Sequence, residues 1–300
     1  MADFVTQAGP LRELVEGELA KLFTPEGLLT DADVPPGLAE PMRYALLGGG
    51  KRLRPVLCLA ACQAVCGDPA PALPAALAIE VLHNYTLVHD DLPCMDDDAM
   101  RRGRPTVHAK YGYAQAVLVG DALQAAAFEL ALLAPSGCAR ILAAAAGPAG
   151  VVGGQWVDVT SAPPHDAARV SYVHAHKTGD LIACACEMGA VAAGAASEEG
   201  FGGNSPRSLA RDYGRALGLA FQIVDDLLDA EDPAKSSELS ILRVATSEEA
   251  RAQARAATEK ALSSLAALAG SPDGRAPSRP QSAALALLRS LAEDQLSRTL

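Results

Sequence analysis

The stretch HDDLPCMDDD, from His89 to Asp98, places five carboxylates within nine positions and interrupts them with a proline. Pro93 prevents a regular helix at this point. A bulge of two residues would bring Asp96 back beside Asp90. This first aspartate cluster is therefore either a solvated acidic turn or a site for a divalent cation, and the rest of the chain has to distinguish the two.

A second aspartate cluster occurs in FQIVDDLLD, from Phe221 to Asp229. On a helix, Asp225 and Asp229 are four residues apart and share a face, where like charges destabilise the helix unless something neutralises them. The flanking residues are apolar, so the pair does not lie on a solvated face. Two such clusters in one chain favour a cation site between facing carboxylates.

The composition predicts a helical protein. Half of the 300 residues are apolar and only 4% are aromatic, so the core must consist mainly of Ala, Leu and Val. Ala and Leu are the best helix formers, whereas strands favour β-branched and aromatic residues. Helical periodicity and short connections predict one all-α domain. We expect helices over 10–22, 36–48, 53–66, 72–92, 112–133, 137–159, 166–195, 206–230, 246–269 and 281–298, with a flexible linker at 270–280.

The net charge of −11 argues against a nucleic-acid partner. The seven cysteines lack zinc spacing, and Cys58, Cys62 and Cys66 recur on one helix face, which is typical of buried thiols in a reducing compartment. The N-terminal segment lacks the apolar core of a signal peptide. No apolar run is long and uncharged enough to span a bilayer. We therefore expect a cytoplasmic protein with no membrane span.

Carboxylate ligands select Mg²⁺ or Mn²⁺ over zinc, and Mg²⁺ usually shares its ligands with substrate phosphates. A phosphorylated substrate needs basic residues nearby, and three stretches supply them: GGGKRLRP at 48–55, MRRGRPT at 100–106 and HKTGD at 176–180. Guanidinium groups match phosphate oxygens in geometry. Each stretch alone is more often an exposed turn, so the inference depends on their combination with the two aspartate clusters.

In their order and spacing, the motifs GGGKRLRP, HDDLPCMDDDAMRRGRPT, GDAL, GGQWVD, HKTGDLI and FQIVDDLLD resemble those of trans-isoprenyl diphosphate synthases of the bacterial farnesyl/geranylgeranyl type, in the polyprenyl synthetase family. The similarity is convincing over roughly residues 10–230 and loose beyond them. The resemblance implies a single-domain isoprenoid-synthase-type helical bundle that forms a homodimer, with a deep central cavity and one aspartate cluster on each facing wall.

The implied reaction is head-to-tail prenyl transfer. An allylic diphosphate, dimethylallyl or geranyl, ionises, the double bond of isopentenyl diphosphate attacks the carbocation, and loss of a proton gives a chain five carbons longer. The released pyrophosphate accepts the proton, so no side-chain base is expected. By the resemblance, the reaction depends on three Mg²⁺ ions, with Mn²⁺ as an alternative.

The resemblance also assigns residues to three sites. The expected metal ligands are Asp90, Asp96 and Asp225, supported by Asp91, Asp226 and Asp229. The residues expected to hold the allylic diphosphate are Arg101, Lys177, Thr178 and Gln222. The isopentenyl diphosphate site, which has no metal, corresponds to Gly50, Lys51, Arg54, His83 and Arg102. Gln155 and Asp158 in GGQWVD also match the family, and whether they support the site stays open.

Product length is expected to depend on the helix that precedes Asp90. One helical turn rises about 5.4 Å, close to the length of one isoprene unit. Tyr85 and Thr86 lie five and four positions before Asp90. An aromatic residue there, with the two-residue insertion in the first cluster, resembles synthases that make the C15 product, farnesyl diphosphate. The C20 product, geranylgeranyl diphosphate, is the alternative, and Tyr85 could also simply pack between helices.

One segment departs from the family pattern. The usual Gly-Lys pair and GKxTYP-like stretch are missing after the second cluster, where AEDPAKSSELSILRVATSEEA stands instead. Lys235 lies nearer to the cluster than the usual lysine and is a candidate to reach the allylic diphosphate. Arg298 is a candidate to cap the site. The segment that would close the site therefore differs from that of the family.

Three other classes are weaker interpretations. A class I terpene cyclase would not need the isopentenyl site. A two-metal phosphohydrolase usually needs His ligands, and only His89 adjoins a cluster. A non-catalytic regulatory subunit of a heteromeric prenyl synthase would be expected to have lost one aspartate cluster. We therefore expect an enzyme, a prenyltransferase, with the regulatory subunit as the alternative of another class.

Overall fold

The computed structural model describes residues 2–30, 33–161, 166–195, 205–230, 239–270 and 276–297. Among these residues the only strands are two short ones that form a hairpin, and nearly everything else is helical. The predicted all-α class is therefore confirmed. Part of the expected linker, 271–275, lies outside the described residues.

The helical elements follow one another along the chain with few long connections. They are α1 (Ala2–Gln7), α2 (Gly9–Lys21), α3 (Pro36–Leu46), α4 (Leu53–Cys66), η1 (Ala70–Ala72), α5 (Leu73–Asp90), α6 (Val107–Tyr111), α7 (Tyr113–Leu133), α8 (Cys138–Ala146), α9 (Val151–Thr160), α10 (Ala167–Val173), η2 (His174–Gly179), α11 (Asp180–Ala192), α12 (Pro206–Leu228), η5 (Ile241–Arg243), α13 (Ser247–Ala269) and α14 (Arg279–Ser297). The strands β1 (Met100–Arg101) and β2 (Arg104–Pro105) pair antiparallel.

Two predicted helices are each divided in the structure. The helix expected over 137–159 breaks between α8 and α9, where Pro148 has no backbone donor and Gly147 and Gly150 have non-helical ψ angles of −166° and −130°. The helix expected over 166–195 contains η2, a turn of π-helix. The extra residue in a π turn changes which side chains share a face, and such turns often occur at functional sites.

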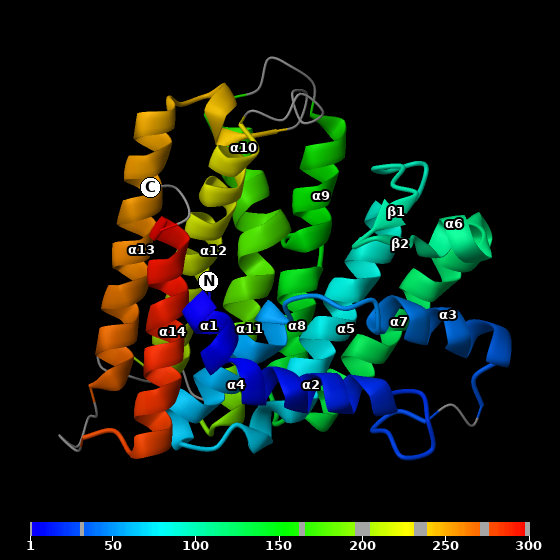
Figure 1. Ribbon diagram of the computed structural model, residues 1–300, viewed down its shortest axis with the longest axis horizontal. Helices are drawn as coiled ribbons and strands as arrows, with labels where there is room; N and C mark the ends of the chain where they lie inside the picture. Colours follow the sequence, from blue (N-terminus) through cyan, green and yellow to red (C-terminus); the bar gives the residue numbers. More distant parts are fainter. Residues whose placement is uncertain are drawn as a thin grey trace.

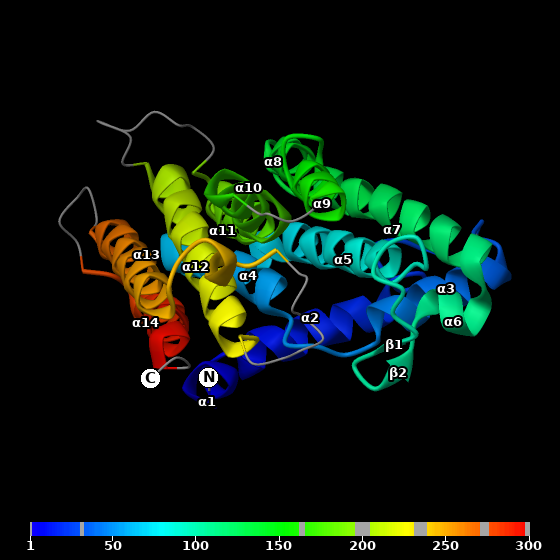
Figure 2. The ribbon, with the colours of Figure 1, turned by 90° about the horizontal axis from the view of Figure 1, so that it is seen from above.

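The bundle directs both aspartate clusters to one end. In Figure 1, α5 and α12 both run upward, so that their C-terminal ends, which carry the clusters, lie at the top of the bundle. Figure 2 shows α11 and α4 inside the bundle, with α13 and α14 on one side and α5 and α7 on the other. Every residue of α11 from Leu181 to Ala192 is buried. The core is therefore central, and the clusters lie at its edge.

The helix α7 is long and apolar enough to cross a membrane by length and composition alone, although it contains Asp121 and Glu129. Its inner face packs against α5 in this structure.

The cysteine expectation needs correction: Cys58 and Cys62 are buried, whereas Cys66 is exposed at the end of α4.

A buried arginine ties the N-terminal half together. Arg52 is only 2% exposed. It donates hydrogen bonds to Glu16 on α2 at 2.9 Å, to Glu80 on α5 at 2.7 Å and to the carbonyl oxygen of Leu46 on α3 at 2.7 Å. Because it immediately precedes α4, one side chain fixes four helices relative to one another.

Replacing Glu80 with glutamine should lower the free energy of unfolding by about 3 kcal/mol, because it leaves the buried Arg52 guanidinium undercompensated. Urea denaturation measures the change. The control is Glu18→Ala, which breaks an exposed pair with Lys21 and should cost less than about 1 kcal/mol. Equal unfolding midpoints for Glu80→Gln and wild type would contradict the role of this buried pair.

Candidate active site

The first aspartate cluster folds back on the end of α5. The helix ends at Asp90, and after the turn through Pro93 the backbone N–H of Asp96 donates a hydrogen bond to the Asp90 carbonyl oxygen at 2.9 Å. The predicted two-residue bulge is thus confirmed. The turn also places Asp97 at a φ of +54°, a conformation that Asp and Asn tolerate better than most residues.

Burial makes the charged form of Asp90 unfavourable. Burial raises the pKa of its carboxyl group to about 6, Lys177 opposes the rise, and the nearby charge of Asp96 adds to it. A carboxylate with a raised pKa next to a second carboxylate is short of positive charge. This end of α5 is therefore a place where a cation would be favourable.

Lys177 supplies part of the positive charge. It lies on η2, and its ammonium group donates a hydrogen bond to Asp158 on α9. Burial lowers the pKa of Lys177, but the carboxylates of Asp158, Asp90 and Asp96 outweigh it and raise the pKa overall. The role that the sequence left open for Asp158 is therefore, in this structure, to hold Lys177 beside the first cluster.

In the second cluster, Asp226 is bound by protein groups. Asp226 is buried and accepts hydrogen bonds from the N–H of Ile241 at 2.7 Å and from Gln222 at 3.1 Å, while Nε2 of His174 lies 3.1 Å from its carboxylate. Burial raises the pKa of Asp226, but these partners, with His174 first, lower it overall. Its oxygens are occupied by protein groups, so Asp226 supports the helix end and does not reach out as a ligand.

Gln222 links this buried group to the cavity wall. Its side-chain oxygen accepts a hydrogen bond from the hydroxyl of Thr178 at 2.7 Å. The structure thus brings Thr178 and Gln222 together, as expected. Asp225 and Asp229 lie on the last turn of α12 and its C-cap, both partly exposed. His174 is the supporting residue that the sequence interpretation missed, because only the fold brings it next to Asp226.

The main cavity, of about 570 Å³, extends from Asp90 between α5, α9 and α11. Its polar residues include the predicted Thr86, Lys177 and Thr178, and Tyr85 lies in its wall. The apolar residues of its lining include Val151, Val152, Trp156, Val159 and Leu181. A charged mouth with an apolar interior suits a molecule that has an anionic head and a hydrocarbon tail.

A second cavity, the basic pocket of about 590 Å³, contains all five residues expected for the metal-free diphosphate site. These are Gly50, Lys51, Arg54, His83 and Arg102. Phe221, which the sequence did not single out, also lines it. No aspartate of either cluster lines this pocket.

Arg54 and His83 are paired in the wall of the basic pocket. Arg54 donates a hydrogen bond to Nε2 of His83 at 3.3 Å. Burial and then the charge of Arg54 hold the pKa of His83 well below its ordinary value, so the ring is neutral and accepts this bond. Nε of Arg54 is buried without a hydrogen-bond partner in the described structure, which leaves a donor for an anion.

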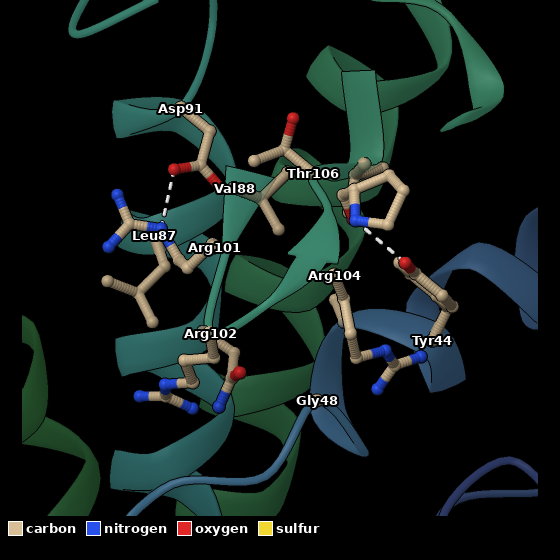
Figure 3. Close-up of a pocket in the computed structure, with 13 residues that line it drawn as sticks. Tyr44, Gly48, Leu87, Val88, Asp91, Arg101, Arg102, Arg104 and Thr106 are labelled. Carbon is tan, nitrogen blue, oxygen red and sulfur yellow. Dashed lines mark hydrogen bonds and ion pairs between the residues drawn. The ribbon is translucent and has the colours of Figure 1, made fainter. Parts of the chain in front are cut away.

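Arg101 is placed differently from the other predicted ligands of the allylic diphosphate. It donates to Asp91 at 2.5 Å and to Asp98 at 3.3 Å and lines a small pocket behind the first cluster (Figure 3). Its assignment to the allylic diphosphate stays a prediction. Asp91, held by Arg101, supports the cluster. Lys235 and Arg298 lie outside the described residues.

The donor set fits a hard divalent cation. Asp90 and Asp96 lie together at the end of α5, and Asp225 lies on the last turn of α12; carboxylate oxygen suits Mg²⁺. Within the described residues no three His, Cys, Asp or Glu side chains form a ready-made metal site. Mg²⁺ in proteins usually shares its ligand sphere with water and substrate phosphates.

In metal-free protein at pH 8, Asp90→Asn should raise the free energy of unfolding by about 3 kcal/mol. The folded-state pKa of about 6 lies above the ordinary 3.8, so wild type loses stability as the pH rises through 6. Well below pH 3.8 the carboxyl group is protonated in both states and the advantage of asparagine disappears. Urea denaturation with a chelator at both pH values measures this, with Asp97→Asn as control. An equal gain at both pH values would contradict the burial argument.

Comparison with known proteins places these features in a family. Residues 35–239 match the family model described as polyprenyl synthetase. Geranylgeranyl pyrophosphate synthase 12, chloroplastic, of Arabidopsis thaliana is 44% identical over 219 residues, which cover 67% of this chain and 59% of that protein. The chloroplastic geranylgeranyl pyrophosphate synthase of Catharanthus roseus is 45% identical over 200 residues, covering 63% and 54%. The chain thus spans less than two thirds of the length of these relatives.

Solved structures match over nearly the whole chain. A farnesyl/geranylfarnesyl diphosphate (FPP/GFPP) synthase from Zymomonas mobilis superposes with a TM-score of 0.78 at 36% identity, covering 97% of this chain and 99% of that one. A geranyltransferase from Helicobacter pylori, complexed with magnesium and isoprenyl diphosphate, has a TM-score of 0.74 at 31% identity, covering 98% and 96%. Together with the two aspartate clusters and the basic pocket, these matches show that the chain belongs to the polyprenyl synthetase family.

Proposed function

We propose that this protein is a prenyltransferase that condenses isopentenyl diphosphate with an allylic diphosphate. The observation that carries the proposal is the way the two cavities meet. Arg54 and His83 line both the main cavity and the basic pocket. Two diphosphate substrates bound in these cavities would therefore lie on either side of one shared wall, with their hydrocarbon parts able to approach each other.

The chain's own residues prepare this reaction. Lys177 and Thr178 place a cation and a hydroxyl donor at the mouth of the main cavity, where the diphosphate of the allylic substrate would bind. Lys51, Arg54 and Arg102 give the basic pocket the positive charge that holds the second diphosphate. The apolar residues beyond Asp90 would contact the hydrocarbon tail of the allylic substrate.

Metal ions complete the proposed site. We propose that Asp90, Asp96 and Asp225 hold three Mg²⁺, for which Mn²⁺ could substitute. Bound metal supplies charge stabilisation to the diphosphate leaving group. The solved relative from Helicobacter pylori, complexed with magnesium and isoprenyl diphosphate, supports this assignment.

For the product we propose a C20 chain, geranylgeranyl diphosphate, because the curated relatives at 43–46% identity carry that name. A second candidate, the C15 farnesyl diphosphate expected from the sequence, is favoured by Tyr85. This side chain is only 6% exposed, lines the main cavity and meets His89 edge-to-face with ring centroids 5.6 Å apart. An aromatic ring so placed would limit the room for a growing tail.

We also propose that the protein is a homodimer in a reducing compartment such as the cytoplasm. The apolar side chains of Leu118 and Leu132 on α7 and Trp156 on α9 are exposed, Trp156 by 70%, and Figure 2 shows α7 and α9 on the same side of the bundle. An apolar surface of this kind is typical of a subunit interface. All seven cysteines are free thiols, which supports the compartment.

An assay with labelled isopentenyl diphosphate, Mg²⁺ and dimethylallyl, geranyl or farnesyl diphosphate as separate primers tests the function. We expect elongation with all three primers and a series that ends at C20, and loss of about a hundredfold or more in rate for Asp225→Ala. A series that ends at C15 would establish the second candidate. No incorporation by folded protein would favour the regulatory-subunit interpretation.

The variant Tyr85→Ala tests whether this side chain limits the length of the prenyl product. Removing the ring should shift the product distribution by one isoprene unit, because the helical rise per turn matches that unit. The matched control is Tyr113→Ala, which removes an exposed ring outside the main cavity and should leave the distribution unchanged. An unchanged product distribution for Tyr85→Ala would mean that other residues limit the length of the product.

The proposed dimer predicts a molar mass by light scattering of about twice the chain's 30.8 kDa. The double variant Leu118→Lys and Leu132→Lys should approach the monomer mass, because it places charge in the apolar face. Leu28→Lys, at an exposed leucine on the loop after α2, is the control and should keep the dimer mass. A wild-type protein of monomer mass would refute the dimer.

A further inference from the structure

The β1–β2 hairpin joins the first aspartate cluster to the turn that opens the basic pocket. We call this turn, residues 47–50, the glycine turn. On one side of the hairpin Arg101 donates to Asp91 of the cluster at 2.5 Å. On the other side Arg102 donates to the carbonyl oxygen of Gly49, and Arg104 donates to that of Leu47 at 3.1 Å. Three arginines of one hairpin therefore join two parts of the site. Figure 3 shows their side chains together with Asp91 and Gly48.

Glycine residues allow the turn to lie close to these arginines. Gly49 and Gly50 have φ values of +79° and +129°, which only glycine adopts readily. A Cβ on Gly50 would lie 2.5 Å from the guanidinium group of Arg102, and a Cβ on Gly48 would lie 3.8 Å from that of Arg104. The hairpin thus lies directly against the turn.

Tyr44 on α3 fixes the second strand of the hairpin. Its hydroxyl donates to the carbonyl oxygen of Pro105 at 2.8 Å, and the Arg104 guanidinium carbon lies 4.2 Å from the centre of its ring. Lys110 stacks on the same ring at 3.9 Å. A cation over an aromatic face is attracted by the ring quadrupole. Tyr44 therefore sets where the Arg104 side chain points.

We propose that Arg104 and Tyr44 are positioning residues for the isopentenyl diphosphate site. Neither lines the basic pocket. They act through the glycine turn, which carries Gly50 into that pocket and leads directly into Lys51. This inference rests on the proposed prenyltransferase function and adds to it a device that sets the position of one substrate relative to the other.

The device should affect the two substrates unequally. The glycine turn contributes to the basic pocket through Gly48 and Gly50, whereas no residue of the turn lines the main cavity. Displacing the glycine turn should therefore lower the affinity for isopentenyl diphosphate. It should not change the main cavity, where the allylic tail would bind. A general loss of folding would weaken both.

The test separates these effects. Arg104→Ala should raise KM for isopentenyl diphosphate about tenfold, which corresponds to one charged hydrogen bond, and change KM for geranyl diphosphate less than twofold. Arg104→Lys keeps a cation over Tyr44 and a donor for Leu47, and should recover KM to within about threefold of wild type. Tyr44→Phe keeps the ring and loses only the hydroxyl, so about a threefold rise is expected. Arg289→Ala, which removes an exposed arginine of α14, is the matched control.

Calorimetric titration of metal-free protein with isopentenyl diphosphate gives the same comparison without turnover. We expect the dissociation constant to rise about tenfold for Arg104→Ala and not to change for Arg289→Ala. Equal affinities for wild type and Arg104→Ala, or equal rises in both KM values, would overturn the inference and leave the proposed function intact. A folded wild-type protein that binds no isopentenyl diphosphate would overturn the proposed function and the inference with it.

Discussion

The site depends on one electrostatic constraint: carboxylates must come together at the end of an apolar bundle. Asp90 loses hydration there and has Asp96 as its neighbour. Lys177, which lies on the π turn η2 and donates a hydrogen bond to Asp158, supplies positive charge near these carboxylates. In the same turn, the hydroxyl of Thr178 donates a hydrogen bond to Gln222 on α12. One irregular turn thus contacts both the first aspartate cluster and the helix that carries the second.

The bundle can hold this arrangement because small residues let its helices approach closely. A Cβ on Gly154 of α9 would lie 2.4 Å from the backbone nitrogen of Lys177, and one on Gly218 of α12 would lie 2.8 Å from Cα of Gly179. A Cβ on Gly189 of α11 would lie 2.1 Å from the carbonyl oxygen of Cys58 on α4. The shortage of aromatic residues and the abundance of Ala and Gly therefore have a structural reason: the helices around η2 pack nearly backbone to backbone.

The sequence predicted the features of the fold and site that depend on neighbouring residues in the chain. A proline after a paired aspartate predicts the bulge that returns Asp96 to Asp90, and the motif resemblance assembles the basic pocket. It failed where partners meet only in the fold. Nothing near His174 in the chain indicates Asp226, and the Ala-rich periodicity around Pro148 continues through the break between α8 and α9. The π turn could not be predicted either, because its single extra residue leaves no compositional signal.

The wall shared by the two cavities has a thermodynamic consequence. Arg54 and His83 belong to both, and one side chain cannot take two positions at once. A ligand that orders this pair in the main cavity changes the free energy of binding in the basic pocket, and linkage requires the reverse effect to have the same size. In the proposed reaction the two substrates would therefore be mutual effectors, each with an affinity that depends on whether the other is bound.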